Sequence, residues 1–165
     1  VNIHAVLERV KQLTVAGMGP GATVREDYDP SLPPVLGNKD QLVQVFLNLG
    51  RNALEAMPDR EGKLVITTRL RLDHRIDLGG GERVPTVGVD FDDDGCGIPP
   101  SSIAQIFDPF FTTRVVGEGT GLGLSIAYQI VEAHGGRLWA EPVATGHFCL
   151  TLPLDHHPQA EADEP

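Results

Sequence analysis

The chain has 165 residues, of which 41% are hydrophobic, and a formal net charge of −10 at pH 7. This length suits one domain with one core, and an acidic balance without a basic run argues against nucleic acid or an anionic membrane as a partner. Cys96 and Cys149 have no metal-ligand spacing and are too few for a disulfide scaffold, and neither a membrane span nor a signal peptide is apparent, so we expect a cytoplasmic domain.

The first third of the chain predicts a helix, a strand and a second helix. Apolar residues at steps of three and four predict an amphipathic opening helix that ends at Gly17, and residues 22–29 read as a short strand before a Pro-rich turn. The second helix runs to about Met57. Asn38 can cap its start and Gln41 occupies the third helical position, which is a variant of the capping box.

The remainder alternates strands with helices and contains no internal repeat. Period-two patterns predict two strands joined by a polar, Gly-rich hairpin loop, with Leu64, Ile66, Thr68, Leu70 and Leu72 on one face of the first. The Pro- and acid-rich end, residues 155–165, has the composition of a disordered tail. The predicted elements are strands 63–73 and 85–93, helix 101–107, a loop to residue 121, a helix to His134, and strands 137–142 and 147–153.

The second helix carries polar residues along the edge of its apolar stripe. Asn48, Asn52 and Glu55 fall within an arc of about 60° at about 100° per residue. A solvated polar face would explain them. The alternative is that the amides at i and i+4 supply oxygen ligands to a hard cation such as Mg²⁺, shared with phosphates.

The strand 85–93 aims a carboxylate at the core. Its inward row of Val87, Val89 and Phe91 continues by the period of two to Asp93. An unpaired buried carboxylate is costly, so Asp93 needs a donor from protein, water or ligand. Glycines at 95 and 97 permit a tight turn and the close approach of a flat ligand, although a bulged turn bonded to its own backbone is the alternative.

A glycine run precedes the last helix. Residues 117–123 alternate glycines whose N–H groups can approach an anion, and the following helix adds the positive end of its dipole. The run is neither a Walker loop nor a dinucleotide fingerprint, and a flexible turn is the alternative. An apolar loop, 106–113, lies upstream and must dock, and Arg114 directly after it could reach an anion at the glycine run.

In this order, these four features resemble the N, G1, F and G2 boxes of sensor histidine kinases. They are Asn48 to Asn52, Asp93-x-Gly95-x-Gly97, Phe107 to Phe111, and Gly119-x-Gly121-x-Gly123. The resemblance covers roughly residues 30–154. The stretches 27–34 and 108–113 look most similar to the nitrogen-regulatory branch of that family.

The resemblance implies an ATP-binding α/β two-layer sandwich of the gyrase, chaperone, kinase and mismatch-repair superfamily, a Bergerat-type fold whose mixed, mostly antiparallel sheet is covered on one face by helices. Asn52 would coordinate Mg²⁺, Asn48 would lie near the phosphates, Asp93 would accept from the adenine amino group, and residues 108–120 would form the ATP lid. Asn48, Asn52 and Arg114 would be catalytic. The implied ATP-binding residues are Asn48, Asn52, Asp93, Gly95, Gly97, Ile98, Arg114, Gly119, Thr120, Gly121, Leu122, Gly123 and Leu124.

Asp94 departs from the family, which commonly has Asn there. The extra carboxylate either weakens ATP binding or points to solvent. A second comparison concerns hydrolysis: the ATPase branches carry a water-activating glutamate four residues before the metal-binding Asn, where this chain has Asn48, an amide that cannot act as a general base. Hydrolysis should therefore be weak.

We therefore expect a catalytic domain, residues 21–154, that passes the γ-phosphate of Mg-ATP to a histidine on a dimerisation domain outside this sequence, with a response regulator as the further partner. None of the six histidines precedes Glu or Asp as the family's acceptor does. Residues 1–20 are either a connection to the dimerisation domain or a helix of this domain. The alternatives are a nucleotide-sensing pseudokinase that controls a partner, and an anti-sigma-type serine kinase, which would carry a glutamate in place of Asn48.

Overall fold

The computed structural model describes residues 1–57, 61–77, 83–109, 122–141 and 145–154. Predictions for the tail, for Phe110, Phe111 and Arg114, and for the glycines 117–121 lie outside these residues. Within them, no helix is both long and apolar enough to cross a membrane. The elements are helices α1 (Ile3–Val15), α2 (Lys39–Ala56) and α3 (Gly123–Ala133), and strands β1 (Thr23–Asp27), β2 (Lys63–Asp77), β3 (Arg83–Asp93), β4 (Arg137–Ala140) and β5 (Gly146–Pro153).

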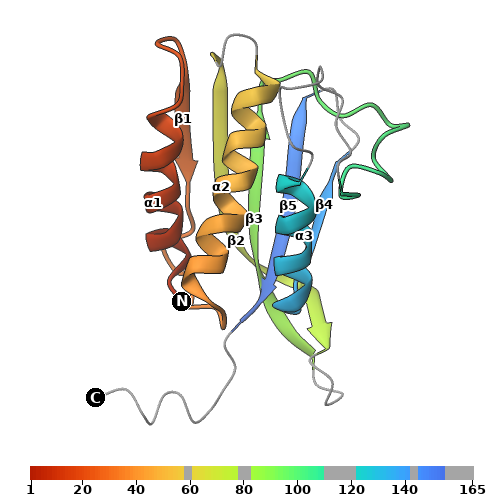
Figure 1. The fold of residues 1–165 in the computed structure, drawn as a ribbon. Helices are drawn as coiled ribbons and strands as arrows, with labels where there is room; N and C mark the ends of the chain where they lie inside the picture. The colour runs from red at the N-terminus through yellow and green to blue at the C-terminus, as the bar shows by residue number, and fades with distance from the viewer. Residues whose placement is uncertain (58–60, 78–82, 110–121, 142–144, 155–165) are drawn as a thin grey trace.

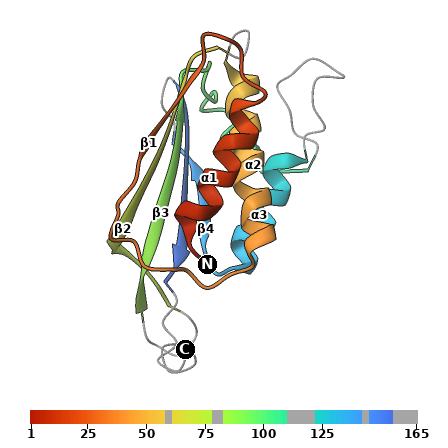
Figure 2. The ribbon, with the colours of Figure 1, turned by 90° about the vertical axis from the view of Figure 1, so that its left-hand side faces the viewer.

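The strands form a single mixed sheet with the order β1-β2-β3-β5-β4. Only β1 and β2 pair in parallel, and the other neighbouring strands are antiparallel. Figures 1 and 2 show α1, α2 and α3 side by side on one face of this sheet, while no helix of the described residues lies on the other face. This arrangement confirms the predicted two-layer α/β sandwich.

The core lies between the two layers. Strands β2, β3 and β5 turn alternate apolar side chains toward the helices, and Phe46 of α2 stacks on Phe91 of β3 with ring centroids 6.0 Å apart. Fully burying such a side chain contributes about 1.5–3 kcal/mol. Helix α1 shares this core through Ile3, Val6, Leu7 and Val10, all of which are almost completely buried.

The β2–β3 hairpin is longer than predicted. The strands continue to Asp77 and from Arg83, so residues 74–77 and Arg83 of the expected loop at 74–83 are strand, and residues 78–82 lie outside the described part of the chain. Their register shifts between Arg71 and Ile76. Leu72 is 59% exposed, so its predicted place in the inward row is wrong. The row ends because the pairing shift interrupts the alternation of faces.

The predicted helix at 101–107 is also wrong in type. Residues 100–107 form successive turns, in which N–H groups of Ser102, Gln105 and Asp108 donate to carbonyls three residues earlier. Bonds of this spacing belong to tight turns, and so short a segment cannot recover the cost of nucleating an α-helix. Ile106 is 5% exposed and anchors these turns in the core.

The start of α2 is tied to the end of α3. Asn38 Oδ1 accepts from the N–H of Gln41 (3.0 Å), as predicted for the cap. The return bond expected from Gln41 is instead made by His134, whose Nε2 accepts from the N–H of Asn38 (3.1 Å) while its Nδ1 bonds the Ile130 carbonyl (2.8 Å). This link fixes α3 relative to the helix that carries Asn48 and Asn52.

Candidate functional site

Asp93 ends β3 with its side chain directed into the molecule. The residue is 4% exposed, and its Oδ1 accepts from the N–H of Gly95 at 2.7 Å. Burial raises the pKa of this carboxyl above its ordinary value, an effect opposed by the N–H groups of Gly95 and Gly146 and reinforced by the charges of Asp92 and Asp94. A carboxylate held in this way can accept a hydrogen bond from a buried donor.

Two glycines make room for this carboxylate. A Cβ on Gly95 would lie 2.6 Å from the Ala56 carbonyl oxygen and 2.7 Å from Asp93 Oδ1. Gly146 of β5 pairs with Asp93, and a Cβ there would lie 2.2 Å from Asp93 Oδ2. Gly97 has φ 72, a left-handed conformation that favours glycine. The turn after β3 therefore requires its glycines and packs against the C-terminal end of α2.

The sequence interpretation missed Gly146. It precedes the closing strand and belongs to no recognisable motif, so only the register of β3 against β5 identifies it.

Asp94, which departs from the family pattern, forms hydrogen bonds with the first residue of β2. Its Oδ2 accepts from the N–H of Lys63 at 2.8 Å, and its own N–H donates to the Lys63 carbonyl at 3.2 Å. These bonds close the end of the β2–β3 ladder. The carboxylate of Asp94 is thus turned toward the start of β2.

The amides of α2 face α3. Asn48 Nδ2 donates to the carbonyl oxygen of Gly123 at 3.1 Å. Asn52 is half-buried and lies one turn farther along α2, toward the end that Gly95 contacts, on the same side of the helix as Asn48. Two predicted site residues therefore lie on α2, which contacts the turn after β3 at its C-terminal end and the start of α3 through Asn48.

Helix α3 begins where an anion can approach. Its N-cap residue is Leu122, which makes no side-chain capping hydrogen bond, and Ser125 Oγ donates to the Leu122 carbonyl (3.0 Å) rather than accepting from an N–H. The N-terminal turn, which includes Gly123 and Leu124, thus lacks a polar side-chain cap among the described residues. An external acceptor can bond such N–H groups, and the helix dipole favours a negative one.

The apolar segment after the β3 turn docks as predicted over its described part. Phe107 stacks on Tyr128 of α3 with centroids 5.0 Å apart and meets Phe148 of β5 edge-on at 6.4 Å. Ile98 also packs on the core. Ile98 and Phe107 thus anchor the two ends of the segment 98–107, which follows the turn after β3.

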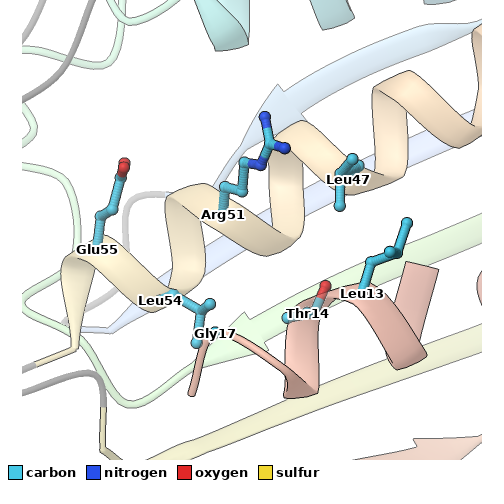
Figure 3. A pocket seen from close by; sticks show the side chains of 7 residues that line it. All are labelled: Leu13, Thr14, Gly17, Leu47, Arg51, Leu54 and Glu55. Atoms are coloured by element: carbon cyan, nitrogen blue, oxygen red, sulfur yellow. The ribbon is translucent and has the colours of Figure 1, made fainter. Parts of the chain in front are cut away.

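A separate groove lies between α1 and α2, with a volume of about 360 Å³ (Figure 3). Its lining contains none of the predicted ATP-binding residues. Glu55, which the sequence groups with Asn48 and Asn52, lines this groove and is exposed. The remaining lining residues are Leu13, Thr14, Gly17, Leu47, Arg51 and Leu54.

The described site suits Mg-ATP by its chemistry. It combines a buried carboxylate, backbone that approaches without Cβ atoms, amide side chains and a helix start without a side-chain cap among the described residues. Such a set can hold an amino-bearing ring at one end and phosphates at the other, and amide oxygen is an acceptable ligand for Mg²⁺.

Residues 37–156 match the family of histidine kinase-, DNA gyrase B-, and HSP90-like ATPases. The chain is 45% identical over 139 residues, 82% of its length, to the sensory histidine kinase/phosphatase NtrB of Rhizobium meliloti (strain 1021), and covers 36% of that relative. It is 30% identical to the solved catalytic domain of the histidine kinase ThkA, with a TM-score of 0.72 and coverage of 92% and 94% of the two chains. Full-length ShkA in complex with AMPPNP is 26% identical, with a TM-score of 0.72 and coverage of 93% of this chain and 30% of ShkA.

Proposed function

This chain belongs to the histidine kinase-, DNA gyrase B- and HSP90-like ATPase family, as an ATP-binding catalytic domain of the histidine kinase type, and we propose that it transfers the γ-phosphate of Mg-ATP to a histidine of its parent protein. The chain spans 36% of the length of its R. meliloti relative, so the acceptor histidine belongs to another domain in this proposal.

The observation that carries the proposal is the buried carboxylate of Asp93. It lies at the end of a strand, 4% exposed, between two glycines whose missing Cβ atoms make space for it. The N–H groups of Gly95 and Gly146 bond this carboxylate, its oxygens can accept a further hydrogen bond, and the adenine amino group is a donor of the required kind. Gly95, Gly97 and Ile98 border the ring in this proposal.

The phosphates lie at the start of α3. Gly119, Thr120, Gly121, Leu122, Gly123 and Leu124 supply backbone N–H groups to them, and Arg114 contributes a positive charge. Asn52 holds Mg²⁺, which neutralises phosphate charge when bound. Asn48 orients the start of α3 through its bond to Gly123 and thereby keeps the N–H groups directed at the phosphates.

The chain favours transfer over hydrolysis. A hydrolase needs a group that takes a proton from water, but the Asn48 amide cannot, and its Nδ2 is engaged as a donor. Catalysis then consists of positioning the phosphoryl group and stabilising its charge. An incoming histidine supplies the nucleophile.

The wider setting follows from the relatives and forms part of the proposal. We assign the parent protein to the nitrogen-regulatory branch, with a response regulator downstream. We place the domain in the cytoplasm, because ATP is available there and cysteines such as Cys96 and Cys149 stay reduced. Residues 1–20 belong to the catalytic unit, because α1 shares its core.

The proposal is tested by phosphotransfer in trans. The chain is mixed with γ-labelled Mg-ATP and the histidine-bearing domain of the R. meliloti relative, either intact or with the acceptor histidine changed to glutamine. Label on the intact acceptor alone supports the proposal. Tight ATP binding without transfer would instead identify a nucleotide-sensing module.

A further inference from the structure

A cluster of polar side chains occupies the face of the sheet opposite the helices. Asp90 and Asp92 of β3, His147 and Cys149 of β5, and Glu141 after β4 form this outer-face cluster. In the register of the sheet Asp90 pairs with Cys149 and Asp92 with His147, so the four side chains share one face. Asp93, by alternation, points to the other face.

Three of these side chains converge on a common point. The ligand atoms of Asp90, His147 and Cys149 all lie within 4.8 Å of one another. Asp90 and His147 are half-buried and Cys149 is buried, so an ion can reach the point from the open face while the thiol lies beneath.

The imidazole of His147 is oriented by a second carboxylate. Its Nδ1 lies 3.1 Å from Asp92 Oδ1. Its Nε2 is buried, has no hydrogen-bond partner among the described residues, and lies 3.8 Å from Asp90 Oδ2. In metal-binding histidines, one ring nitrogen commonly bonds a carboxylate while the other nitrogen faces the metal ion. His147 has this arrangement, with Nε2 facing the point shared with Asp90 and Cys149.

A further carboxylate borders the cluster. Glu141 Oε1 accepts from Trp139 Nε1 at 2.9 Å and lies 3.8 Å from Cys149 Sγ. Its backbone N–H donates to the His147 carbonyl at 2.9 Å, which places it beside that residue. It therefore borders the cluster on the side of Cys149, outside the group of three converging ligand atoms.

We propose that Asp90, His147 and Cys149 bind a Zn²⁺ ion, with water as fourth ligand and Asp92 orienting the histidine. Mixed sulfur, nitrogen and oxygen ligands suit Zn²⁺, whereas Mg²⁺ and Ca²⁺ prefer oxygen alone. The proposed ion is therefore distinct from the magnesium of the nucleotide site.

Without a metal ion, His147 lies between Asp90 and Asp92, Arg69 faces Asp92, and the Cys149 thiol donates a long hydrogen bond to Glu141 Oε1. Burial raises the pKa of Cys149, and the charges of Asp90 and Glu141 raise it further. A divalent cation reverses that effect, because it stabilises the thiolate and is attracted by the same carboxylates. Binding then releases the thiol proton to solvent.

The test uses Co²⁺ as a spectroscopic substitute for Zn²⁺ on the whole chain. The buffer contains no nucleotide. We expect about one Co²⁺ per chain, a thiolate-to-cobalt charge-transfer absorption, and its loss on addition of Zn²⁺. Cys149→Ser should abolish the absorption, while Cys96→Ser, which changes the exposed cysteine, should retain it.

His147→Gln provides a second variant if Cys149→Ser fails to fold, and it should lower Co²⁺ affinity by at least about tenfold. Circular dichroism checks that each variant is folded. The proposal is overturned if the wild-type chain shows no charge-transfer absorption. It is equally overturned if Cys96→Ser removes the absorption or if His147→Gln leaves the affinity unchanged.

Discussion

Replacement of Asp93 by Asn should weaken ATP binding without unfolding the domain. The Asn carbonyl oxygen can still accept from the Gly95 N–H, which Asp93 Oδ1 bonds at 2.7 Å, so the turn after β3 is retained. The second oxygen, however, becomes an NH₂ group, which opposes the adenine amino donor. The loss of a charge-assisted hydrogen bond costs about 1.5–3 kcal/mol, or about 10- to 150-fold in Kd.

Calorimetric titration with Mg-ATP measures this change, and circular dichroism confirms the fold. The matched control is Asp94→Asn, which removes the same charge from the neighbouring residue. Its amide oxygen can keep the bond to the Lys63 N–H, so we expect its Kd to change by less than about threefold. A folded Asp93→Asn protein with wild-type affinity would remove Asp93 from the adenine site and refute the reasoning.

Three further results are expected. Gly146→Ala places a Cβ 2.2 Å from Asp93 Oδ2, so it should destabilise the domain by about 1–3 kcal/mol in urea unfolding and weaken ATP binding at least as much as Asp93→Asn; unchanged stability would contradict the packing. Asn52→Ala should abolish the enhancement of nucleotide binding by Mg²⁺ and leave a metal-independent remainder, an idea lost if magnesium helps both proteins equally. Because the pKa of Asp93 is raised in the folded state, that state holds its proton more tightly, and the free energy of unfolding of the wild type relative to Asp93→Asn should fall as pH rises above the ordinary pKa of an Asp carboxyl; a difference that is constant or rises with pH would argue against the buried charge.

The regular parts of the fold could be predicted because their periodicity extends over many residues. The stripe of α2 and the alternation of β3 predict both elements and the inward direction of Asp93. The turns at 100–107 and the exposed Leu72 could not be predicted, because a short apolar segment and a register shift leave no periodic signal.

Contacts between distant segments were also inaccessible to sequence reasoning. The bond from Asn38 to His134 spans 96 positions, and Gly146 acquires its role only through pairing with Asp93. Likewise, His147 lies two residues before Cys149 on the same strand, but Asp90 becomes their neighbour only through the β3–β5 register.

The central claim is that this domain delivers phosphate to histidine rather than to water. The most direct measurement follows γ-labelled Mg-ATP in one reaction containing this chain and a histidine-bearing dimerisation domain, and compares label on protein with label released as inorganic phosphate. We predict label on the added domain, none on this chain, and slow release of phosphate when the acceptor is omitted. Stable labelling of this chain alone, or rapid phosphate release despite Asn48, would contradict the account.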